Sequence, residues 1–324
     1  MRVFRGLAHP RWQRPCALTI GNFDGVHRGH QAMLALLTNE ARHRGIVPAV
    51  MTFEPHPRDW FAQQAAAAGR SGAAAPLRIA TLRDKLAELS RCGIEQVVVL
   101  RFDAALAALS PQAFIDDVLV GGLGVRYVLV GDDFRFGARR AGDYALLDAA
   151  GAAGGFDVAR MMSYEVHGLR VSSSVVRQAL VDGDMARAAA LLGRPYAVSG
   201  HVVHGRKLGR ELGFPTLNLR VPQGRPAAGG IFVARLHGLT AGPLPAVASL
   251  GVRPSVEDAG RVLLEVHALQ WPLPPQAGYG RIVRVDLLHR LHEERRYDSL
   301  PALRDGIAAD RDAALAWFAA ELAR

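Results

Sequence analysis

GNFDGVHRGH, residues 21–30, decides the fold of the first half of the chain. An apolar run typical of a buried strand, residues 17–20, precedes it, and apolar residues recur at helical spacing in residues 31–44, which follow it. A strand, a glycine-rich turn and a helix start leave backbone N–H groups and the positive end of the helix dipole exposed. The sequence therefore predicts a phosphate site at this turn.

His27 and His30 lie three residues apart at the predicted helix start, so they face the same way. Two imidazoles beside a dipole end can hold phosphate oxygens as negative charge grows there. A pair at this spacing can equally be half of a metal site, or two unrelated surface residues. The ten-residue string in its strand, turn and helix context favours the phosphate interpretation.

Strands and helices alternate along the rest of this half. Residues 47–53, 96–100 and 127–130 favour strands, and residues 82–91 and 111–119 have helical spacing. The alternation implies an α/β domain with a parallel sheet and helices on both faces.

Two features follow the second predicted strand. Pro55 and Pro57 are expected to exclude a helix and to stiffen the exit from the strand. Residues 63–75 are rich in alanine and glycine without a strong period, so a mobile loop, a frayed helix end or a flap is expected there.

The loops after two of these strands carry candidate ligand-binding side chains. His56 follows the second predicted strand, and Asp133, Phe134 and Phe136 follow the fourth. Open α/β sheets bind ligands at the carboxyl ends of their strands, which makes these residues candidates for flavin, base or ribose contacts. His56 can equally be a structural loop residue, and the two phenylalanines can equally belong to the core.

A run of serines opens the last predicted helix of this half. Ser172 and Ser173 suit the capping of a helix, and they equally offer hydroxyl and N–H groups to phosphates. Arg177 lies one turn inside the helix. Capping alone explains the serines, but it does not require Arg177.

The pattern changes near residue 183, so the chain is expected to divide into domains of residues 1–183 and 184–324. Strand-favouring runs punctuated by glycine and proline indicate an antiparallel β-barrel. A short helix precedes them and a terminal helix, with Ser299 as its N-cap, follows. The predicted strands are residues 196–203, 230–236, 262–269 and 282–288.

GRKLGRELGFPTLN, residues 205–218, carries glycines and basic residues that could wrap a triphosphate. Thr216 and Asn218 are two residues apart, so on an extended segment both point to one face. Hydroxyl and amide oxygens suit Mg²⁺, and nucleotide phosphates would complete its coordination. The phosphate-binding candidates here are Gly205, Lys207, Gly209, Gly213 and Pro215.

Glu265 stands within the apolar strand run 262–269, where an acid is unusual. One explanation is an ion pair at the end of a barrel. The functional interpretation is a general base for an alcohol, its pKa adjusted by partial burial.

Composition limits the class of protein. The 324 residues are half hydrophobic, and no apolar run approaches the ~20 residues that span a bilayer. Residues 1–15 lack the apolar core of a signal peptide, so a cytoplasmic protein without a membrane partner is expected. The net charge of +9 suits ATP as well as nucleic acid, but no nucleic-acid motif accompanies it. The two cysteines have no metal-ligand spacing and are expected to be free, buried or half-buried thiols.

The motifs of the first half resemble a known family. Residues 21–30 are similar to the His-x-Gly-His signature of the nucleotidyltransferase superfamily, and the flanking GNFDG narrows the resemblance to the bacterial bifunctional riboflavin kinase/FAD synthetases. Residues 133–137 resemble that family's Asp-Phe-x-Phe-Gly loop. Residues 171–177 resemble its Ile-Ser-Ser-Thr-x-Ile-Arg segment, with Ser174 in place of threonine.

The second half carries the remaining motifs in order. Residues 205–218 resemble the riboflavin kinase loop that ends in Pro-Thr-Ala-Asn, with Leu217 at the alanine position. Residues 265–267 resemble its Glu-Val-His, and residues 248–255 resemble its Ala-Asn-Ile-Gly-x-Arg-Pro-Thr, with Ser249 in place of asparagine. A tail motif matches with His292 where arginine is usual, so the resemblance covers nearly the whole chain.

The resemblance implies a Rossmann-like FMN adenylyltransferase followed by a β-barrel riboflavin kinase, using ATP and Mg²⁺ on riboflavin and FMN in a monomer or weak homo-oligomer. It implies catalytic roles for Glu265, His27 and His30 and metal ligation by Thr216 and Asn218. The implied phosphate contacts of the adenylyltransferase are Gly21, Asn22, Phe23, Asp24, Gly25, Ser172, Ser173 and Arg177.

Two alternatives compete with this interpretation. A cytidylyltransferase or a pantetheine-type adenylyltransferase would use the same histidine motif, but it would leave the second half unexplained. A non-catalytic flavin- or RNA-binding protein would not need His27, His30, Thr216, Asn218 and Glu265 together.

Overall fold

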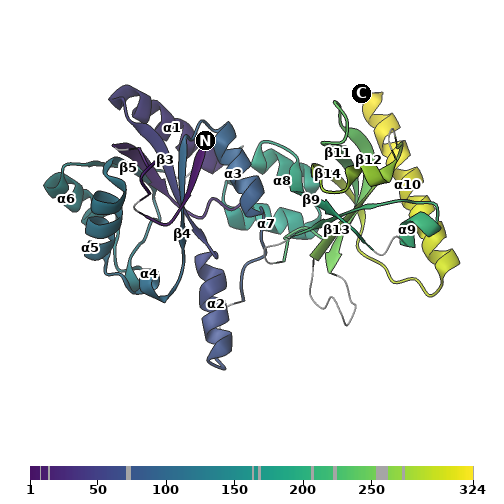
Figure 1. Cartoon of the computed structure of the whole chain (residues 1–324), viewed down its shortest axis with the longest axis horizontal. Helices are drawn as coiled ribbons and strands as arrows, with labels where there is room; N and C mark the ends of the chain where they lie inside the picture. Colours follow the sequence, from purple (N-terminus) through teal and green to yellow (C-terminus); the bar gives the residue numbers. More distant parts are fainter. Residues whose placement is uncertain are drawn as a thin grey trace. The chain divides into compact units, whose positions relative to one another are not determined.

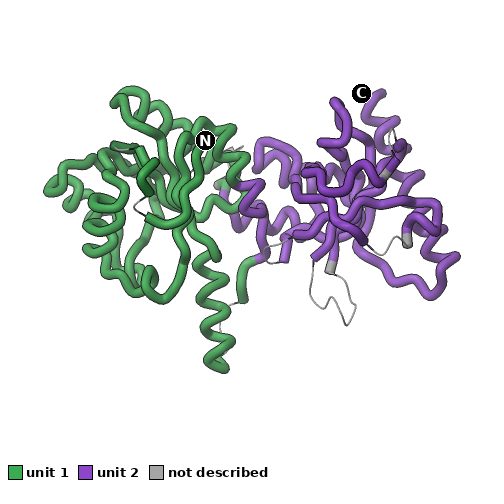
Figure 2. Tube along the Cα trace, viewed as in Figure 1, with its two compact units in different colours: residues 1–76, 86–171 green, residues 77–85, 172–324 purple. Residues whose placement is uncertain are grey.

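The computed structural model describes residues 1–7, 9–13, 15–70, 74–162, 164–166, 169–205, 208–221, 225–252, 262–271 and 274–323 (Figure 1). They form two compact units. Unit 1 comprises residues 1–76 and 86–171, and unit 2 comprises residues 77–85 and 172–324 (Figure 2).

Unit 1 contains a six-stranded sheet in the order β1-β4-β3-β2-β5-β6. Every neighbouring pair is parallel, which confirms the predicted α/β class. The central strand β2 is buried along its whole length, because helices cover both faces of such a sheet. The strands are β1 (Arg2–Arg5), β2 (Cys16–Ile20), β3 (Val47–Glu54), β4 (Gln96–Arg101), β5 (Val125–Gly131) and β6 (Asp157–Met161).

Helices connect these strands. The predicted helix at 111–119 begins as α5 and continues as a π-helix, Phe114–Leu123, whose apolar side chains enter the core under the sheet. The remaining helices are α1 (Arg28–Arg44), α2 (Pro57–Ala67), α3 (Leu82–Arg91), α4 (Ala104–Ala108), α5 (Pro111–Ala113), a 3₁₀ turn at Ala138–Arg140, and α6 (Tyr144–Gly154). A hairpin of β7 (Glu165–Val166) and β8 (Leu169–Arg170) follows β6.

The prediction that Pro55 and Pro57 exclude a helix was wrong. Pro57 is the first residue of α2, where its missing N–H costs nothing because the first N–H groups of a helix have no intrahelical partner. Helix α2 continues to Ala67, so residues 63–67 of the stretch expected to be a mobile loop, a frayed helix end or a flap form the end of a helix; residues 71–73 lie outside the described residues.

Unit 2 contains a closed antiparallel barrel in the order β10-β13-β12-β11-β14-β9. Its strands alternate between side chains that fill the barrel and side chains on its outer face, as in β13, where Leu264 and Val266 are buried between the less buried Leu263, Glu265 and His267. The strands are β9 (Tyr196–Val203), β10 (Leu217–Arg220), β11 (Gly230–His237), β12 (Leu244–Val252), β13 (Val262–Ala268) and β14 (Ile282–His292).

Helices complete unit 2. Helix α10 (Leu300–Leu322) packs on β11 and β12, and the Ser299 hydroxyl accepts from the Ala302 N–H at 3.2 Å, as predicted for an N-cap. Arg290 of β14 donates to the carbonyls of Val181 and Asp182, which end α7. The shorter helices are α7 (Ser173–Asp182), α8 (Met185–Leu192), α9 (Leu208–Glu211) and a 3₁₀ turn at Pro275–Gly278.

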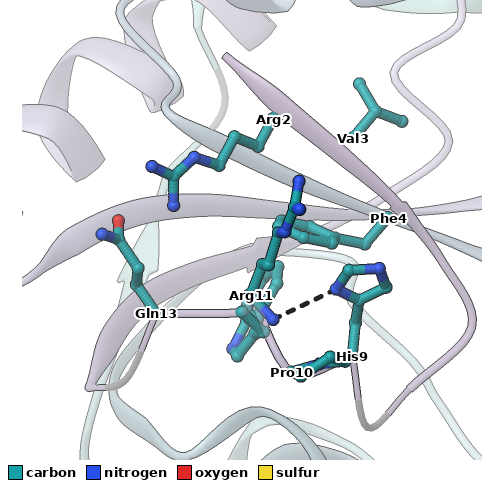
Figure 3. A pocket seen from close by; sticks show the side chains of 8 residues that line it. Arg2, Val3, Phe4, His9, Pro10, Arg11 and Gln13 are labelled. Carbon is teal, nitrogen blue, oxygen red and sulfur yellow. Dashed lines mark hydrogen bonds between the residues drawn. The ribbon is translucent and has the colours of Figure 1, made fainter.

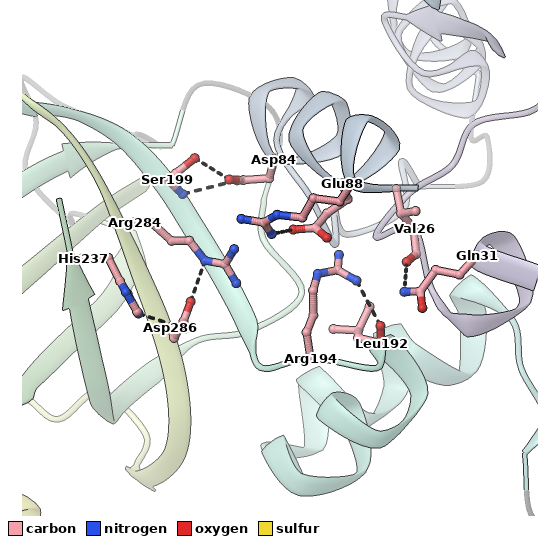
Figure 4. Close-up of polar contacts among 11 residues, drawn as sticks. Val26, Gln31, Asp84, Glu88, Leu192, Arg194, Ser199, His237, Arg284 and Asp286 are labelled. Atoms are coloured by element: carbon pink, nitrogen blue, oxygen red, sulfur yellow. Dashed lines mark hydrogen bonds and ion pairs between the residues drawn. The ribbon is translucent and has the colours of Figure 1, made fainter. Parts of the chain in front are cut away.

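Residues 77–85 pack within unit 2 although their sequence lies within the first half. The Arg78 N–H donates to the Arg225 carbonyl at 2.7 Å, and the Ala227 N–H donates to the Arg78 carbonyl at 2.8 Å. The Asp84 carboxylate accepts from both the backbone N–H and the hydroxyl of Ser199 on β9 (Figure 4). The boundary of unit 2 is therefore not a single point in the chain.

Candidate functional sites

The glycine-rich turn lies between β2 and α1, as predicted. Phe23 and Val26 hold the left-handed backbone conformation, with φ of 48° and 41°, and Gly25 has φ of 85°. Non-glycine residues in this region are strained, and such strain concentrates at functional sites. The side chains of Phe23 and Val26 are 1% and 0% exposed, so packing holds the strained turn in place.

His27 is the N-cap of α1, and its Nδ1 accepts from the His30 N–H at 3.3 Å. The two imidazole rings stack with centroids 3.7 Å apart and an interplanar angle of 17°. Phe23 packs against His30 at 4.9 Å. The predicted pair therefore forms one rigid group at the positive end of α1.

Three predicted loops lie at the carboxyl ends of the parallel strands. β2 pairs with β3 on one side and with β5 on the other. Strands β3 and β4 therefore extend the sheet in one direction from β2, and β5 and β6 extend it in the opposite direction. Open α/β sheets bind ligands at the carboxyl ends of the strands next to such a reversal. The histidine turn follows β2, His56 follows β3, and Asp133 follows β5.

The turn also meets the segment that precedes the serines. A Cβ added to Gly29 would lie 3.3 Å from the His27 ring and 3.4 Å from the Val171 carbonyl, so the backbone at Gly29 packs closely against the His27 ring. Ser172 caps α7 by accepting from the Val175 N–H at 3.4 Å. Arg177 Nε donates to the Leu77 carbonyl at 2.6 Å.

Asn22 carries the next polar groups of the turn. Its carbonyl accepts from the Thr52 hydroxyl at 3.3 Å, which ties the turn to β3. Its side-chain Oδ1 is buried and has no hydrogen-bond partner among the described residues. Asp24 is 2% exposed. A ligand that donates a hydrogen bond would satisfy the Asn22 oxygen.

His56 and the two phenylalanines have structural contacts. His56 is the N-cap of α2, and its Nδ1 accepts from the Arg58 N–H at 3.1 Å. Phe136 is 7% exposed within the core, and Phe134 stacks on it at 5.5 Å. Asp133 is exposed. These contacts account for the positions of His56 and Phe136, and their predicted flavin contacts stay predictions.

A hollow of about 780 Å³ lies beside β1 in unit 1 (Figure 3). None of the predicted site residues lines it. Phe4 contacts His9 and Trp12 there, and the Arg11 N–H donates to His9 Nδ1 at 3.2 Å. Its lining residues are Arg2, Val3, Phe4, His9, Pro10, Arg11, Trp12 and Gln13.

In unit 2 the barrel brings the predicted kinase residues into one row. Asn218 of β10 lies directly opposite Glu265 of β13, and Glu265 lies opposite Ser249 of β12. Directly paired residues of an antiparallel sheet share one face, so the three side chains lie side by side. Leu217 is fully buried on the opposite face, and its bulk fills the barrel interior away from Asn218.

Asn218 has a polar atom that nothing described in the chain satisfies. Its side chain is 5% exposed, and its Oδ1 is buried without a hydrogen-bond partner among the described residues. A Cβ on Gly205 would lie 2.6 Å from Asn218 Cγ and 2.7 Å from Oδ1, so any other residue there would displace the Asn218 amide. Asn218 Oδ1, with the half-buried Thr216 two residues earlier, is a hard oxygen donor set that fits Mg²⁺.

The loop before Asn218 is closed by its own backbone. The Phe214 N–H donates to the Gly209 carbonyl at 2.6 Å, and the Phe214 carbonyl leaves no room for a side chain at Gly209. Gly213 has φ of 89°, which favours glycine. Lys207 lies outside the described residues.

Glu294 was not among the predicted site residues. Its carboxylate lies where a side chain on Gly251 would lie, and the Ser249 hydroxyl donates to it at 3.4 Å. Burial raises the pKa of Glu294, and the charge of Glu265 adds to the effect. A glycine inside a strand signals a close approach, and Gly251 was the available sign of this second carboxylate.

Comparisons with known proteins agree on one family. Residues 9–175 match the family model of FAD synthetase, and residues 192–318 match that of riboflavin kinase. A bifunctional riboflavin kinase/FMN adenylyltransferase of Escherichia coli (strain K12) is 44% identical over 321 residues, 98% of each chain. The protein of the same description from Pseudomonas fluorescens is 42% identical over 98% of this chain and 97% of its own.

A solved structure extends the likeness to the fold. A macrolide-efflux protein from Streptococcus pneumoniae aligns with a TM-score of 0.74 and 26% identity over 96% of this chain and 98% of its own. Within the described part of the chain, we find no helix with the length and apolar character to cross a bilayer. The same residues contain no group of three or more His, Cys, Asp or Glu side chains placed to hold a metal ion.

Proposed function

The chain belongs to the family of bifunctional riboflavin kinases/FMN adenylyltransferases, and from this membership we propose which residues carry each reaction. One reaction phosphorylates riboflavin with ATP to give FMN, and the other transfers an adenylyl group from ATP to FMN, giving FAD and pyrophosphate. The observation that carries the assignment is the placement of the proposed catalytic residues: His27 and His30 lie in unit 1, and Glu265 lies in unit 2 opposite Asn218.

In the adenylyl transfer, a phosphate oxygen of FMN attacks the α-phosphorus of ATP, and the bond to pyrophosphate breaks. The backbone N–H groups of residues 21–25 and the stacked His27 and His30 would stabilise the growing negative charge. Ser172, Ser173 and Arg177 would hold the leaving phosphates. No covalent intermediate with the protein is required.

In the kinase reaction, Glu265 would take the proton of the riboflavin 5′-hydroxyl as its oxygen attacks the γ-phosphorus and ADP leaves. Thr216 and Asn218 would hold Mg²⁺, which supplies charge neutralisation on the phosphates when bound. The buried Oδ1 of Asn218, which has no hydrogen-bond partner within the described part of the chain, supports this role. Gly205, Lys207, Gly209, Gly213 and Pro215 would shape the phosphate loop.

Two substitutions test the division of labour. We expect His30→Ala to lower FAD formation from supplied FMN by about 10²–10³-fold and to spare FMN formation, because it removes one group that stabilises the transition state. His43→Ala, an exposed histidine at the other end of α1, is the matched control. Chromatographic separation of the flavins after incubation with ATP and Mg²⁺ measures both reactions.

Glu265→Gln should impair the kinase reaction and spare the adenylyl transfer. FMN formation should fall by about 10²–10⁴-fold, because the amide cannot accept the proton, while FAD formation from FMN persists. If either variant stopped both reactions in a folded protein, the assignment of two separate sites would be wrong.

We also propose that the protein acts in the cytoplasm as a monomer or weak homo-oligomer, without a nucleic-acid or membrane partner. Light scattering on the purified protein, with and without ATP and riboflavin, would measure its mass in solution.

A further inference from the structure

His267 lies where the backbone pairing between β10 and β13 stops. The register joins Asn218 to Glu265 and Leu217 to Val266, and it ends there. In β13, Glu265 and His267 are both only partly buried, whereas their neighbours fill the barrel. His267 is therefore on the outer face with Glu265, next to the residues that precede β10.

The His267 imidazole makes a hydrogen bond to the segment before β10, just beyond the last backbone pair of β10 and β13. His267 Nδ1 lies 2.9 Å from the Pro215 carbonyl oxygen. A carbonyl can only accept, so Nδ1 carries the hydrogen. Burial lowers the pKa of His267, which keeps the ring neutral and leaves its single proton on Nδ1.

Aromatic neighbours hold the ring in this orientation. Phe214 meets the imidazole edge-on, with centroids 5.6 Å apart and planes at 75°, and Trp271 lies 6.3 Å away. The Phe214 N–H donates to the Gly209 carbonyl at 2.6 Å. The Gly213–Phe214 peptide group is thus held by Gly209, and the Pro215–Thr216 peptide group is held by His267.

We propose that His267 is a positioning residue of the kinase reaction: by holding the Pro215 carbonyl, it fixes Thr216 beside Asn218 so that both oxygens can bind the same metal. This inference rests on the proposed role of Thr216 and Asn218 as metal ligands. Glu265 acts on the hydroxyl group of riboflavin, whereas His267 acts through Thr216 on the metal at the ATP phosphates. The two residues, two apart on one strand, therefore affect different substrates.

Two substitutions separate the hydrogen bond from the packing. The side-chain amide of His267→Asn can donate from a place near that of Nδ1, whereas His267→Leu keeps an apolar side chain without a donor. We expect the Mg²⁺ concentration that half-saturates FMN formation to rise about tenfold in His267→Leu, the effect of one neutral hydrogen bond. It should change less than about threefold in His267→Asn. The KM for riboflavin should stay unchanged in both.

Two readouts do not depend on turnover. In the wild-type protein, ¹⁵N-labelled histidine should include the signal of a neutral, Nδ1-protonated ring that disappears in His267→Asn. Calorimetric titration with Mg²⁺ and a non-hydrolysable ATP analogue should resolve two classes of site. Only one of them should weaken, by about tenfold, in His267→Leu. FAD formation from supplied FMN reports that the rest of the chain is intact.

The outcomes distinguish the inference from the assignment beneath it. If Asn218→Ala leaves the Mg²⁺ dependence unchanged in an active enzyme, the proposed metal ligands are wrong. If Asn218→Ala changes it and His267→Leu does not, His267 has no positioning role. Equal losses in His267→Asn and His267→Leu would show that the ring acts through packing alone, which also overturns the proposal.

Discussion

Both candidate sites depend on residues with little conformational tolerance. In the histidine turn the left-handed positions include Phe23 and Val26, whereas Gly21 and Gly29 keep negative φ and pack closely against the rings of Phe23 and His27. Sequence reasoning assigns unusual backbone angles to glycine, so it located this turn but not the residues that bear its strain. The side chains of Phe23 and Val26 are buried, and this burial, which only the folded core provides, holds the two residues in the strained conformation.

Gly205 offers a test at this scale. A methyl group in Gly205→Ala would meet the Asn218 side chain, whose Cγ would lie 2.6 Å away. The amide oxygen must then move, and we expect FMN formation to fall about 10²-fold, because misplacement by about 1 Å costs that much. FAD formation from FMN should be unaffected.

Gly242→Ala is the control for Gly205→Ala, because a Cβ at Gly242 would meet nothing within 4 Å. It should leave both reactions unchanged. An active kinase in Gly205→Ala with normal Mg²⁺ dependence would show that Asn218 does not need its present position.

At the scale of elements, periodicity was sufficient where an element is regular. The predicted helix at 82–91 and the predicted strand at 196–203 have the observed bounds of α3 and β9. Strand β10 was missed as an element because its first two residues fall in the segment interpreted as a phosphate loop, and β12 because Pro245 and Gly251 interrupt its pattern. The start of α2 was missed because a proline can begin a helix as readily as it can end one.

The first turn of α3 should make stability depend on pH. Burial raises the pKa of Asp84 above its ordinary value of 3.8, although Ser199, Thr81 and Arg284 favour the charged form. The native protein therefore holds this proton more tightly than the unfolded chain does. The stabilisation from Asp84 is complete below the unfolded pKa and is lost as the pH rises through the folded pKa.

The side chain in Asp84→Asn cannot titrate. The melting temperature of this variant minus that of the wild type should therefore increase as the pH rises from about 4 to about 7. Calorimetry at several pH values measures the difference. Asp84→Ala, which also loses the hydrogen bonds from Ser199 and Thr81, should be less stable than Asp84→Asn at every pH with the same trend. A difference that is constant with pH would contradict this account.

At the scale of the whole molecule, order along the chain is a poor guide to what packs together. The expected division at residue 183 lies between the two family matches, which end at 175 and begin at 192. The compact units instead change at 171, and residues 77–85 join unit 2. The change of pattern from alternating helices and strands to strands alone marked the barrel. It could not reveal the backbone bonds of Arg78, which are made with residues distant in sequence.

These bonds predict the behaviour of a fragment of residues 184–324. The fragment lacks the Arg78 carbonyl that accepts from the Ala227 N–H and the Asp84 carboxylate that accepts from the Ser199 N–H. It also lacks the α7 carbonyls that Arg290 binds. We expect the Ala227 and Ser199 amides to exchange with solvent faster than in the full chain, and the fragment to melt at a lower temperature.

Amides in the middle of β11 provide the internal control, because their partners on β12 and β14 remain in the fragment. A peptide of residues 77–91, added to the fragment, should slow exchange at Ala227 and Ser199 again without changing β11. Equal protection of Ala227 and Ser199 in the fragment and in the full chain would mean that residues 184–324 are complete as a domain. A fragment that fails to protect even β11 would instead show that the barrel itself requires the segments before residue 184.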